Sequence, residues 1–186
     1  MKHIIFFTCI ALEFTIIVML IISHFSLQHR IWPPKNQKSW QQYLMLFLFN
    51  STALLIILIG LLDWGSAGFP RWLRIAGFIA WVIGVLLAIW AIMKLGVKST
   101  MGNLGELIKL GPYQYSRNPQ YIGFMLSLFG WILITNSSST FVVSLLACIP
   151  LWIVPFIEEP WMLNNYGESY IEYLHSVPRF LLRNKM

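Results

Sequence analysis

Two polar stretches stand directly against long apolar runs, and both contain residue types that can bind ligands. The first, residues 111–119, reads Gly-Pro-Tyr-Gln-Tyr-Ser-Arg-Asn-Pro. The second begins with Glu-Glu-Pro at residues 158–160 and continues with Tyr-Gly-Glu-Ser-Tyr at 166–170 and Val-Pro-Arg at 177–179. Ionisable groups beside membrane segments usually mark functional sites. We therefore expect these two stretches to carry the chemistry.

The paired carboxyl groups of Glu158 and Glu159 follow a hydrophobic run. Adjacent carboxylates at an apolar boundary repel each other and resist the loss of water. They either mark the end of a membrane span or face a polar or cationic ligand. Neighbouring residues on a helix point about 100° apart, so we expect at least one of the two side chains to point into the helix bundle.

Arg117, Asn118 and Pro119 open another apolar run. One interpretation is structural: the arginine binds lipid phosphate, the asparagine caps a helix, and the proline occupies its first turn. The other interpretation is that Arg117 and Asn118 contact a ligand. Tyr113 and Tyr121 fit the aromatic belt of a membrane interface as well as they fit a binding site.

The composition predicts a single-domain integral membrane protein. The 186 residues are 58% hydrophobic and only 11% charged, whereas soluble domains are about a quarter charged. The net charge of +6 fits basic loops on one membrane face and does not indicate a nucleic-acid partner. The two cysteines and four histidines are scattered, so neither a disulfide framework nor a metal site is expected. Glu13 stands alone in the first apolar run, where it would pair with a basic residue or be protonated.

Five apolar runs predict membrane-spanning helices. They cover residues 4–22, 43–62, 75–93, 121–135 and 141–157. The fourth and fifth are expected to form a helical hairpin around a polar turn at residues 136–139. Pro150 and Pro155 are expected to kink the fifth helix, and Pro160 suits the first position of a new one.

A stripe of apolar and aromatic residues follows the fifth span. Its members recur at spacings of three and four residues: Leu163, Tyr166, Tyr170 and Leu174. This spacing predicts an amphipathic helix on the membrane surface, which would fold the tail back over the loop that contains Arg117. The predicted fold class is therefore an all-α integral membrane domain over residues 1–186, with three spans in residues 1–95.

The basic residues sort to one side of this five-span topology. The connections at residues 23–42 and 94–120, together with the tail, carry ten of the 13 Lys and Arg residues. The positive-inside rule places these segments in the cytoplasm and the N-terminus outside. Both polar stretches then lie on the cytoplasmic side of the membrane.

The motifs, taken in order, resemble those of integral membrane methyltransferases. The pattern Gly-Pro-Tyr-x-Tyr-x-Arg-Asn-Pro-x-Tyr-x-Gly is followed by Glu-Glu-Pro and then by Tyr-Gly-x-x-Tyr-x-x-Tyr-x-x-x-Val-Pro-Arg. That family includes isoprenylcysteine carboxyl methyltransferases and phospholipid N-methyltransferases. The resemblance covers residues 110–180. Arg-Asn-Pro, in place of the Arg-His-Pro usual in the carboxyl methyltransferases, looks more like the phospholipid branch.

The resemblance implies an enzyme that uses S-adenosylmethionine as methyl donor and a lipid or lipid-modified acceptor, with residues 96–186 as its catalytic region. It implies that the residues lining the cofactor side of the active site are Gly111, Tyr113, Arg117, Asn118, Tyr121, Glu158 and Glu159. It also places Arg179 near the acceptor, and makes Arg117, Glu159 and Arg179 the expected catalytic residues. The acceptor, the glutamate that contacts the cofactor, and the oligomeric state stay open.

Methyl transfer suits these residue types. The positive sulfonium of the donor would be held by Glu158 or Glu159 and by tyrosine faces. Most of the acceleration can come from alignment and electrostatics. An amine acceptor must lose a proton, which requires a carboxylate as base, whereas a carboxylate or thiolate acceptor would be oriented by Arg117 or Arg179.

Two other classes of function stay open at this stage. In a non-catalytic membrane binding or scaffold protein, the motifs would be only helix caps and interfacial anchors. The second alternative is a reductase that binds a nicotinamide cofactor, because some sterol reductases share a similar C-terminal hairpin.

Overall fold

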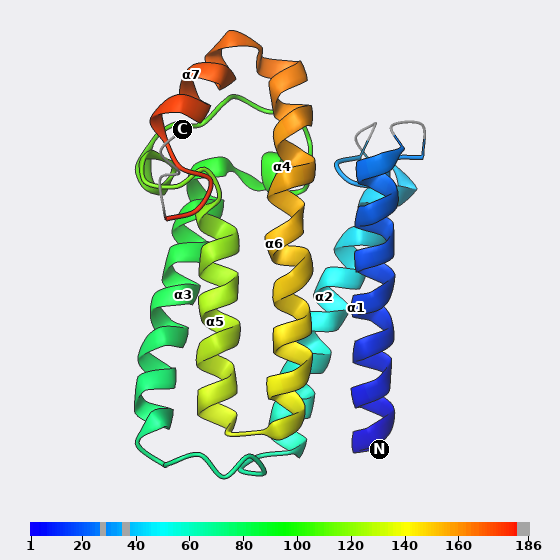
Figure 1. Ribbon diagram of the computed structural model, residues 1–186, viewed down its shortest axis with the longest axis vertical. Coiled ribbons are helices and arrows are strands. Elements are labelled where there is room, and N and C mark those ends of the chain that lie inside the picture. The colour runs from blue at the N-terminus through cyan, green and yellow to red at the C-terminus, as the bar shows by residue number, and fades with distance from the viewer. Residues whose placement is uncertain (27–28, 35–37, 182–186) are drawn as a thin grey trace.

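The computed structural model describes residues 1–26, 29–34 and 38–181, and these residues form helices without a strand. Four helices are long and apolar enough to cross a membrane: α1 (Lys2–Phe25), α2 (Trp40–Leu62), α3 (Leu73–Leu95) and α6 (Ser138–Tyr166). The apolar helix α5 (Pro119–Thr135) has 17 residues, so the fifth span stays a prediction. All five run along the long axis of the molecule (Figure 1).

The helix α6 has 29 residues and continues through Pro150, Pro155 and Pro160. The prediction that Pro160 begins a new helix is therefore wrong. Membrane helices tolerate interior prolines because neighbouring groups satisfy the freed carbonyls. The helix ends instead at Gly167, whose φ of 56° and ψ of −132° are accessible mainly to glycine.

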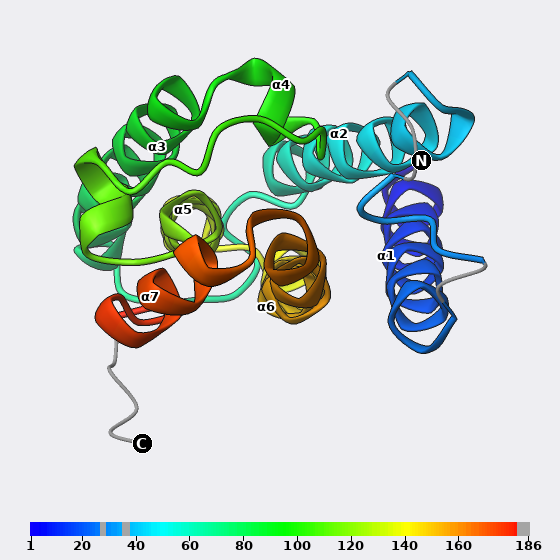
Figure 2. The same ribbon diagram turned by 90° about the horizontal axis from the view of Figure 1, so that it is seen from above.

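The predicted amphipathic stripe is divided between two helices, so its assignment to one helix is also wrong. Leu163 and Tyr166 belong to α6, whereas Tyr170 and Leu174 belong to α7 (Glu168–Ser176). After Gly167, α7 runs from the end of α6 back toward α5 (Figure 2). It buries Tyr170 and Tyr173. The turn at Gly167 thus directs two aromatic side chains toward the end of the bundle.

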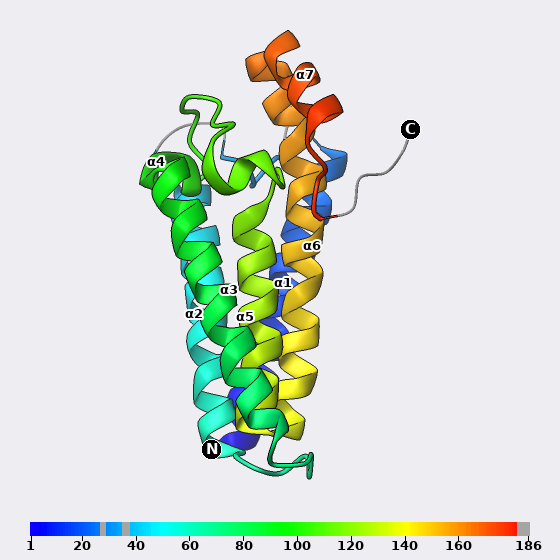
Figure 3. The same cartoon turned by 90° about the vertical axis from the view of Figure 1, so that its left-hand side faces the viewer.

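Glycines bring α3 and α5 into backbone contact, and the two helices lie side by side (Figure 3). A Cβ atom at Gly84 would lie 2.7 Å from the carbonyl oxygen of Gly123, and one at Gly130 would lie 2.6 Å from that of Gly77. Small residues permit such close approach between membrane helices. This pair fixes the position of α5, which begins with the end of the first polar motif.

Asp63 joins three segments at the end of the bundle opposite the polar motifs. Its carboxylate accepts hydrogen bonds from Lys2 Nζ at 2.8 Å, Ser137 Oγ at 2.8 Å and the Ser139 backbone N–H at 3.0 Å. Burial opposes the ionised form, but these hydrogen bonds outweigh it and lower the pKa of Asp63. They hold the turn between α5 and α6, so the predicted hairpin is confirmed.

The longer connections gather at the other end, where α6 meets α7 (Figure 1). They include α4 (Val97–Thr100) and the short 3₁₀ helix η1 (Gly111–Gln114). Between α1, α2 and α6, a core of buried apolar side chains includes Ile16, Met45 and Val154. The two polar motifs therefore share one end of the molecule; its cytoplasmic location stays a prediction.

Candidate functional site

The two polar motifs meet in an ion pair between Arg117 and Glu159. Arg117 Nη2 lies 2.8 Å from Glu159 Oε1, and Arg117 Nε donates to the same oxygen at 3.2 Å. The two side chains are only 8% and 10% exposed. Residues 42 positions apart in the sequence are thus brought together, as the sequence predicts.

A second arginine completes the environment of Glu159. Arg179 Nε donates to Glu159 Oε1 at 2.8 Å, and its Nη2 pairs with Oε2. The hydrogen bond from this guanidinium to Glu159 raises the pKa of Arg179, and the guanidinium carbon lies 3.9 Å from the centre of the Phe156 ring. The negative charge of Glu159 is therefore compensated by two cations.

Arg117 also holds the C-terminal tail. Its Nη1 donates to the carbonyl oxygens of Leu174 and Val177, both at 3.0 Å. Its backbone N–H donates to Pro178 O at 2.9 Å. The prediction that the tail folds back over Arg117 is confirmed, and one guanidinium joins the loop, α6 and the segment after α7.

Asn118 takes part in the same attachment. Its side-chain Nδ2 donates to the carbonyl oxygen of Arg179 at 3.1 Å, and Ser116 Oγ donates to that oxygen at the same distance. Asn118 occupies the N-cap position of α5, but its side chain makes no capping hydrogen bond, so the predicted side-chain cap is wrong. The backbone N–H of Asn118 instead donates to Ser116 Oγ at 3.1 Å.

Glu158 has partners of a different kind. Its Oε1 accepts hydrogen bonds from Trp32 Nε1 at 2.8 Å and from Tyr121 OH at 3.0 Å. Trp32 is positioned by Ser23 of α1, whose Oγ accepts the backbone N–H groups of Ile31 and Trp32. Trp32 was not predicted as a site residue, because nothing in the local pattern links it to a residue 126 positions away.

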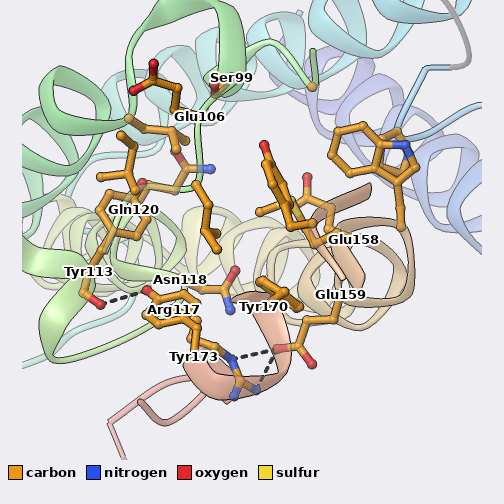
Figure 4. Close-up of a pocket in the computed structure, with 18 of the residues that line it drawn as sticks. Ser99, Glu106, Tyr113, Arg117, Asn118, Gln120, Glu158, Glu159, Tyr170 and Tyr173 are labelled. Carbon is orange, nitrogen blue, oxygen red and sulfur yellow. Dashed lines mark hydrogen bonds and ion pairs between the residues drawn. The ribbon is translucent and has the colours of Figure 1, made fainter. Parts of the chain in front are cut away.

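A cavity of about 70 Å³ lies between the two motifs (Figure 4). Five of the predicted site residues line it: Tyr113, Arg117, Asn118, Glu158 and Glu159. Three others lie outside its lining: Gly111, Tyr121 and Arg179. Gly111 forms the turn into η1 with a φ of 65°, a conformation that favours glycine. Tyr121 and Arg179 do not line the cavity themselves. They bind Glu158 and Glu159, respectively, and both glutamates line it.

Three buried polar atoms in the cavity lining have no hydrogen-bond partner among the described residues: Tyr113 OH, Asn103 Oδ1 and Gln120 Oε1. Burial raises the pKa of Tyr113, which keeps its hydroxyl protonated and able to donate. Buried polar groups are costly without a partner. The lining therefore suits a ligand with hydrogen-bonding groups.

Further lining residues come from the tail and the loop. Tyr170 and Tyr173 border the cavity, and Tyr173 OH donates to Tyr113 O at 2.7 Å. Tyr166 OH donates to Gly105 O at 2.7 Å and joins the end of α6 to the loop before η1. From the sequence, Tyr166 and Tyr170 were expected only as part of the amphipathic stripe, and Tyr173 appeared only in the tyrosine repeat of the family pattern. That repeat was the signal that could have indicated their place at the cavity.

Comparison with known proteins identifies a methyltransferase pattern. Residues 72–169, from the start of α3 into α7, match the sequence model of the family described as "Phospholipid methyltransferase". The match therefore includes α3, which lies before the motifs quoted from the sequence. No solved structure gives a significant match.

Three curated proteins are similar to parts of the chain. Phosphatidylethanolamine N-methyltransferase B of Dictyostelium discoideum is 29% identical over 98 residues, which is 49% of each chain. Steroid 5-alpha-reductase DET2 of Solanum lycopersicum is 30% identical over 112 residues, covering 59% of this chain and 43% of that one. Protein-S-isoprenylcysteine O-methyltransferase of Schizosaccharomyces pombe is 26% identical over 176 residues, covering 77% and 71% respectively. The aligned part spans about half the length of the first relative and less than half the length of the second.

Proposed function

The chain belongs to the phospholipid methyltransferase family, and from this premise we propose that it is a multi-pass membrane enzyme that transfers a methyl group from S-adenosylmethionine to a lipid or lipid-like acceptor. The observation that carries the proposal is the meeting of two distant motifs around one cavity, with Tyr113, Arg117 and Asn118 on one side and Glu158 and Glu159 on the other. The basic residues in the connections at this end favour a cytoplasmic site.

Glu158 is the better candidate of the two glutamates for a cationic ligand. Glu159 is already compensated by Arg117 and Arg179. Among the described residues, Glu158 accepts hydrogen bonds from two neutral donors, both at Oε1, and from none at Oε2. S-adenosylmethionine, when bound, supplies an electrophilic methyl group on a positively charged sulfonium. The Glu158 carboxylate would stabilise that charge.

The other lining groups suit the remainder of such a donor. Tyr113 OH, Asn103 Oδ1 and Gln120 Oε1 are the unpaired polar atoms that would bind its hydroxyl, amine or ring nitrogen groups. A small-molecule pocket usually measures about 300–1,000 Å³, whereas this cavity measures about 70 Å³. We propose that the cavity widens on binding by separation of the loop around Gly105 from Tyr166, which one hydrogen bond joins.

The charge distribution favours an amine acceptor over an anionic one. Glu159 binds both Arg117 and Arg179, which competes with any role of these guanidinium groups in orienting a carboxylate acceptor. An amine must lose its proton for its lone pair to attack the methyl carbon. We propose Glu158, whose Oε2 receives no hydrogen bond from the described residues, as the carboxylate that would accept that proton. A phospholipid with a primary or secondary amine headgroup is therefore the acceptor class that we propose.

A reductase is the second candidate, because the chain is similar to a steroid 5-alpha-reductase over 112 residues. That activity would require a nicotinamide cofactor with phosphate groups, for which free cations are the usual partners. Arg117 and Arg179, the two arginines at the site, are both paired with Glu159. The site therefore favours the sulfonium donor.

The proposal is tested by donor binding and by transfer. Purified protein in detergent is titrated with S-adenosylmethionine and, in parallel, with NADPH by calorimetry. It is then incubated with methyl-labelled donor and phosphatidylethanolamine, and the lipid product is identified by mass spectrometry. We expect binding of S-adenosylmethionine and a mass increase for each added methyl group. Binding of NADPH alone by folded protein would transfer the assignment to the reductase.

A further inference from the structure

Glu13 lies near the middle of α1 and is 1% exposed. Neither of its carboxyl oxygens has a hydrogen-bond partner among the residues that the structure describes. Ionisable side chains inside membrane segments are costly to bury and usually mark the path or site of a ligand. The proposed donor site does not use Glu13, so this carboxyl group requires its own explanation.

Glu13 lines a cavity of about 460 Å³ inside the helix bundle. The walls come from α1, α2, α3, α5 and α6 and are mostly apolar and aromatic. Thr52 and Gln120 also line it, and their side-chain oxygens Thr52 Oγ1 and Gln120 Oε1 are buried without a partner in the described part of the chain. An apolar pocket of this size with a few inward polar groups is the usual form of an organic ligand site.

This membrane cavity borders the proposed donor site. Trp32 and Tyr121 line it, and both donate to Glu158, which lines the smaller cavity. Gln120 lines both. A lipid whose headgroup reaches Glu158 could therefore place its chain in the membrane cavity.

The packing of α1 against α6 gives the depth of Glu13. The two helices share two buried clusters: Cys9 and Ala147 belong to one, and Ile16 and Leu151 belong to the other. Glu13 lies between Cys9 and Ile16 on α1, so we take the middle of residues 147–151 as its level on α6. With a rise of 1.5 Å per residue, that level lies roughly 14 Å along the helix from Glu158.

We propose that the membrane cavity selects an acceptor whose chain bears a hydroxyl group at this depth, and that Glu13 and Thr52 bind that hydroxyl. The inference rests on the proposed function for the identity of the chain as the methyl acceptor. Glu13 is then a specificity-determining residue that lies far from the reacting atoms.

The hydrogen-bonding capacity of the two side chains favours a hydroxyl over an unsubstituted chain. A plain hydrocarbon would leave Glu13 and Thr52 without partners in an apolar cavity, which carries the full penalty of burying them. A hydroxyl group both donates and accepts, so it can satisfy a carboxyl oxygen and a threonine hydroxyl together. The same groups reject the isosteric chain that lacks an oxygen there.

The test compares three long-chain amines as probes of the cavity in the purified protein. They are octadecylamine, 12-hydroxyoctadecylamine with its hydroxyl at mid-chain, and 2-hydroxyoctadecylamine with its hydroxyl beside the amine. Each displaces a brominated octadecylamine that quenches tryptophan fluorescence, because Trp32, Trp81 and Trp131 line the cavity. The concentration for half displacement is measured in the parent protein and in Glu13→Leu.

We expect the mid-chain hydroxyl to lower the half-displacement concentration about tenfold relative to octadecylamine, as one well-made buried hydrogen bond would do. 2-hydroxyoctadecylamine should behave like octadecylamine. Glu13→Leu should remove the preference, whereas Glu13→Gln, which keeps hydrogen-bonding groups, should retain most of it. Equal displacement by all three amines, or an unchanged preference in Glu13→Leu, would overturn the inference.

Control variants separate this selection from folding and from the proposed function. Thr15→Val changes an exposed residue of the same helix and should leave the preference unchanged. Thr52→Val should weaken it even if Glu13→Leu does not fold. S-adenosylmethionine binding is measured on the same samples and should survive in Glu13→Leu. A hydroxyl preference without donor binding would refute the proposed function while leaving the cavity assignment in place.

Discussion

Glu158 and Glu159 are consecutive residues whose carboxylates have partners of different kinds. Two guanidinium groups bind Glu159, whereas an indole N–H and a phenol O–H bind Glu158. Successive side chains on a helix point about 100° apart, so the two face different neighbours. From this separation we propose that Glu159 holds the tail and that Glu158 binds the ligand.

Substitution of each glutamate by glutamine should therefore give different results. Glu158→Gln should weaken S-adenosylmethionine binding by at least about tenfold, as expected for loss of a charged partner worth about 1.5–3 kcal/mol. Glu159→Gln should lower the free energy of unfolding by about 2–4 kcal/mol, because it leaves a buried arginine uncompensated; the partial exposure of Arg179 keeps the loss below that of a fully buried pair. Calorimetry and thermal unfolding in detergent measure the two quantities.

Glu172→Gln is the matched control for both variants, because Glu172 is an exposed carboxylate on α7. It should change neither quantity. If Glu158→Gln bound the donor as tightly as the parent protein, the assignment of Glu158 to the sulfonium would be wrong.

Arg117→Lys should release the C-terminal tail while retaining a positive charge. The guanidinium of Arg117 binds Glu159 and the carbonyl oxygens of Leu174 and Val177 at once. An ammonium lacks the planar fork needed for these directions. Amide hydrogen exchange in residues 174–179 should accelerate by at least about tenfold, measured by mass spectrometry.

Arg71→Lys, at the opposite end of the bundle, should leave that exchange unchanged. If the tail were equally protected from exchange in Arg117→Lys and in the parent protein, its backbone contacts alone would be sufficient to hold it.

Tyr166→Phe should ease access to the donor cavity. The variant removes the hydrogen bond from Tyr166 OH to Gly105 O, which joins α6 to the loop. Such a bond contributes about 1 kcal/mol, so the rates of donor association and dissociation should both rise by up to about fivefold. Stopped-flow fluorescence measures them. Tyr115→Phe, at an exposed tyrosine, is the control, and identical rates in Tyr166→Phe would argue for another entry route.

Asp63 should make stability depend on pH in the acidic range. Its pKa is lowered, because hydrogen bonds from Lys2, Ser139 and Ser137 outweigh the effect of burial. The unfolded chain then binds a proton at higher pH than the folded protein does. The stabilisation is complete above about pH 4, the ordinary pKa of aspartate, and is lost progressively as the pH falls below it.

The melting temperature in detergent, measured from neutral pH down to about pH 3, reports this loss. Asp63→Asn should have a lower melting temperature than the parent protein at neutral pH and a flatter acid dependence. If the melting temperatures of Asp63→Asn and of the parent protein fell in parallel as the pH is lowered, other carboxyl groups would control the acid transition.

Several features could be predicted from local pattern alone. The apolar runs predicted α1, α2 and α3 to within a few residues, because a chain in lipid must satisfy its backbone groups within a helix. The prediction that a new helix begins at Pro160 was wrong. Proline is common at the first position of a helix, but a packed helix also tolerates it in its interior. The positive φ of Gly167 determined the actual end.

The sequence by itself determined that this is a helical membrane protein, that its polar groups collect beside two helix ends, and that their order resembles a methyltransferase. These properties follow from residue type and spacing along one chain. Only the tertiary structure decided that Glu159 is compensated by two arginines, that Glu158 meets Trp32, and that Glu13 faces a cavity. Such partnerships depend on which helix faces meet, and packing between distant segments, such as the backbone contact of α3 with α5, fixes those faces.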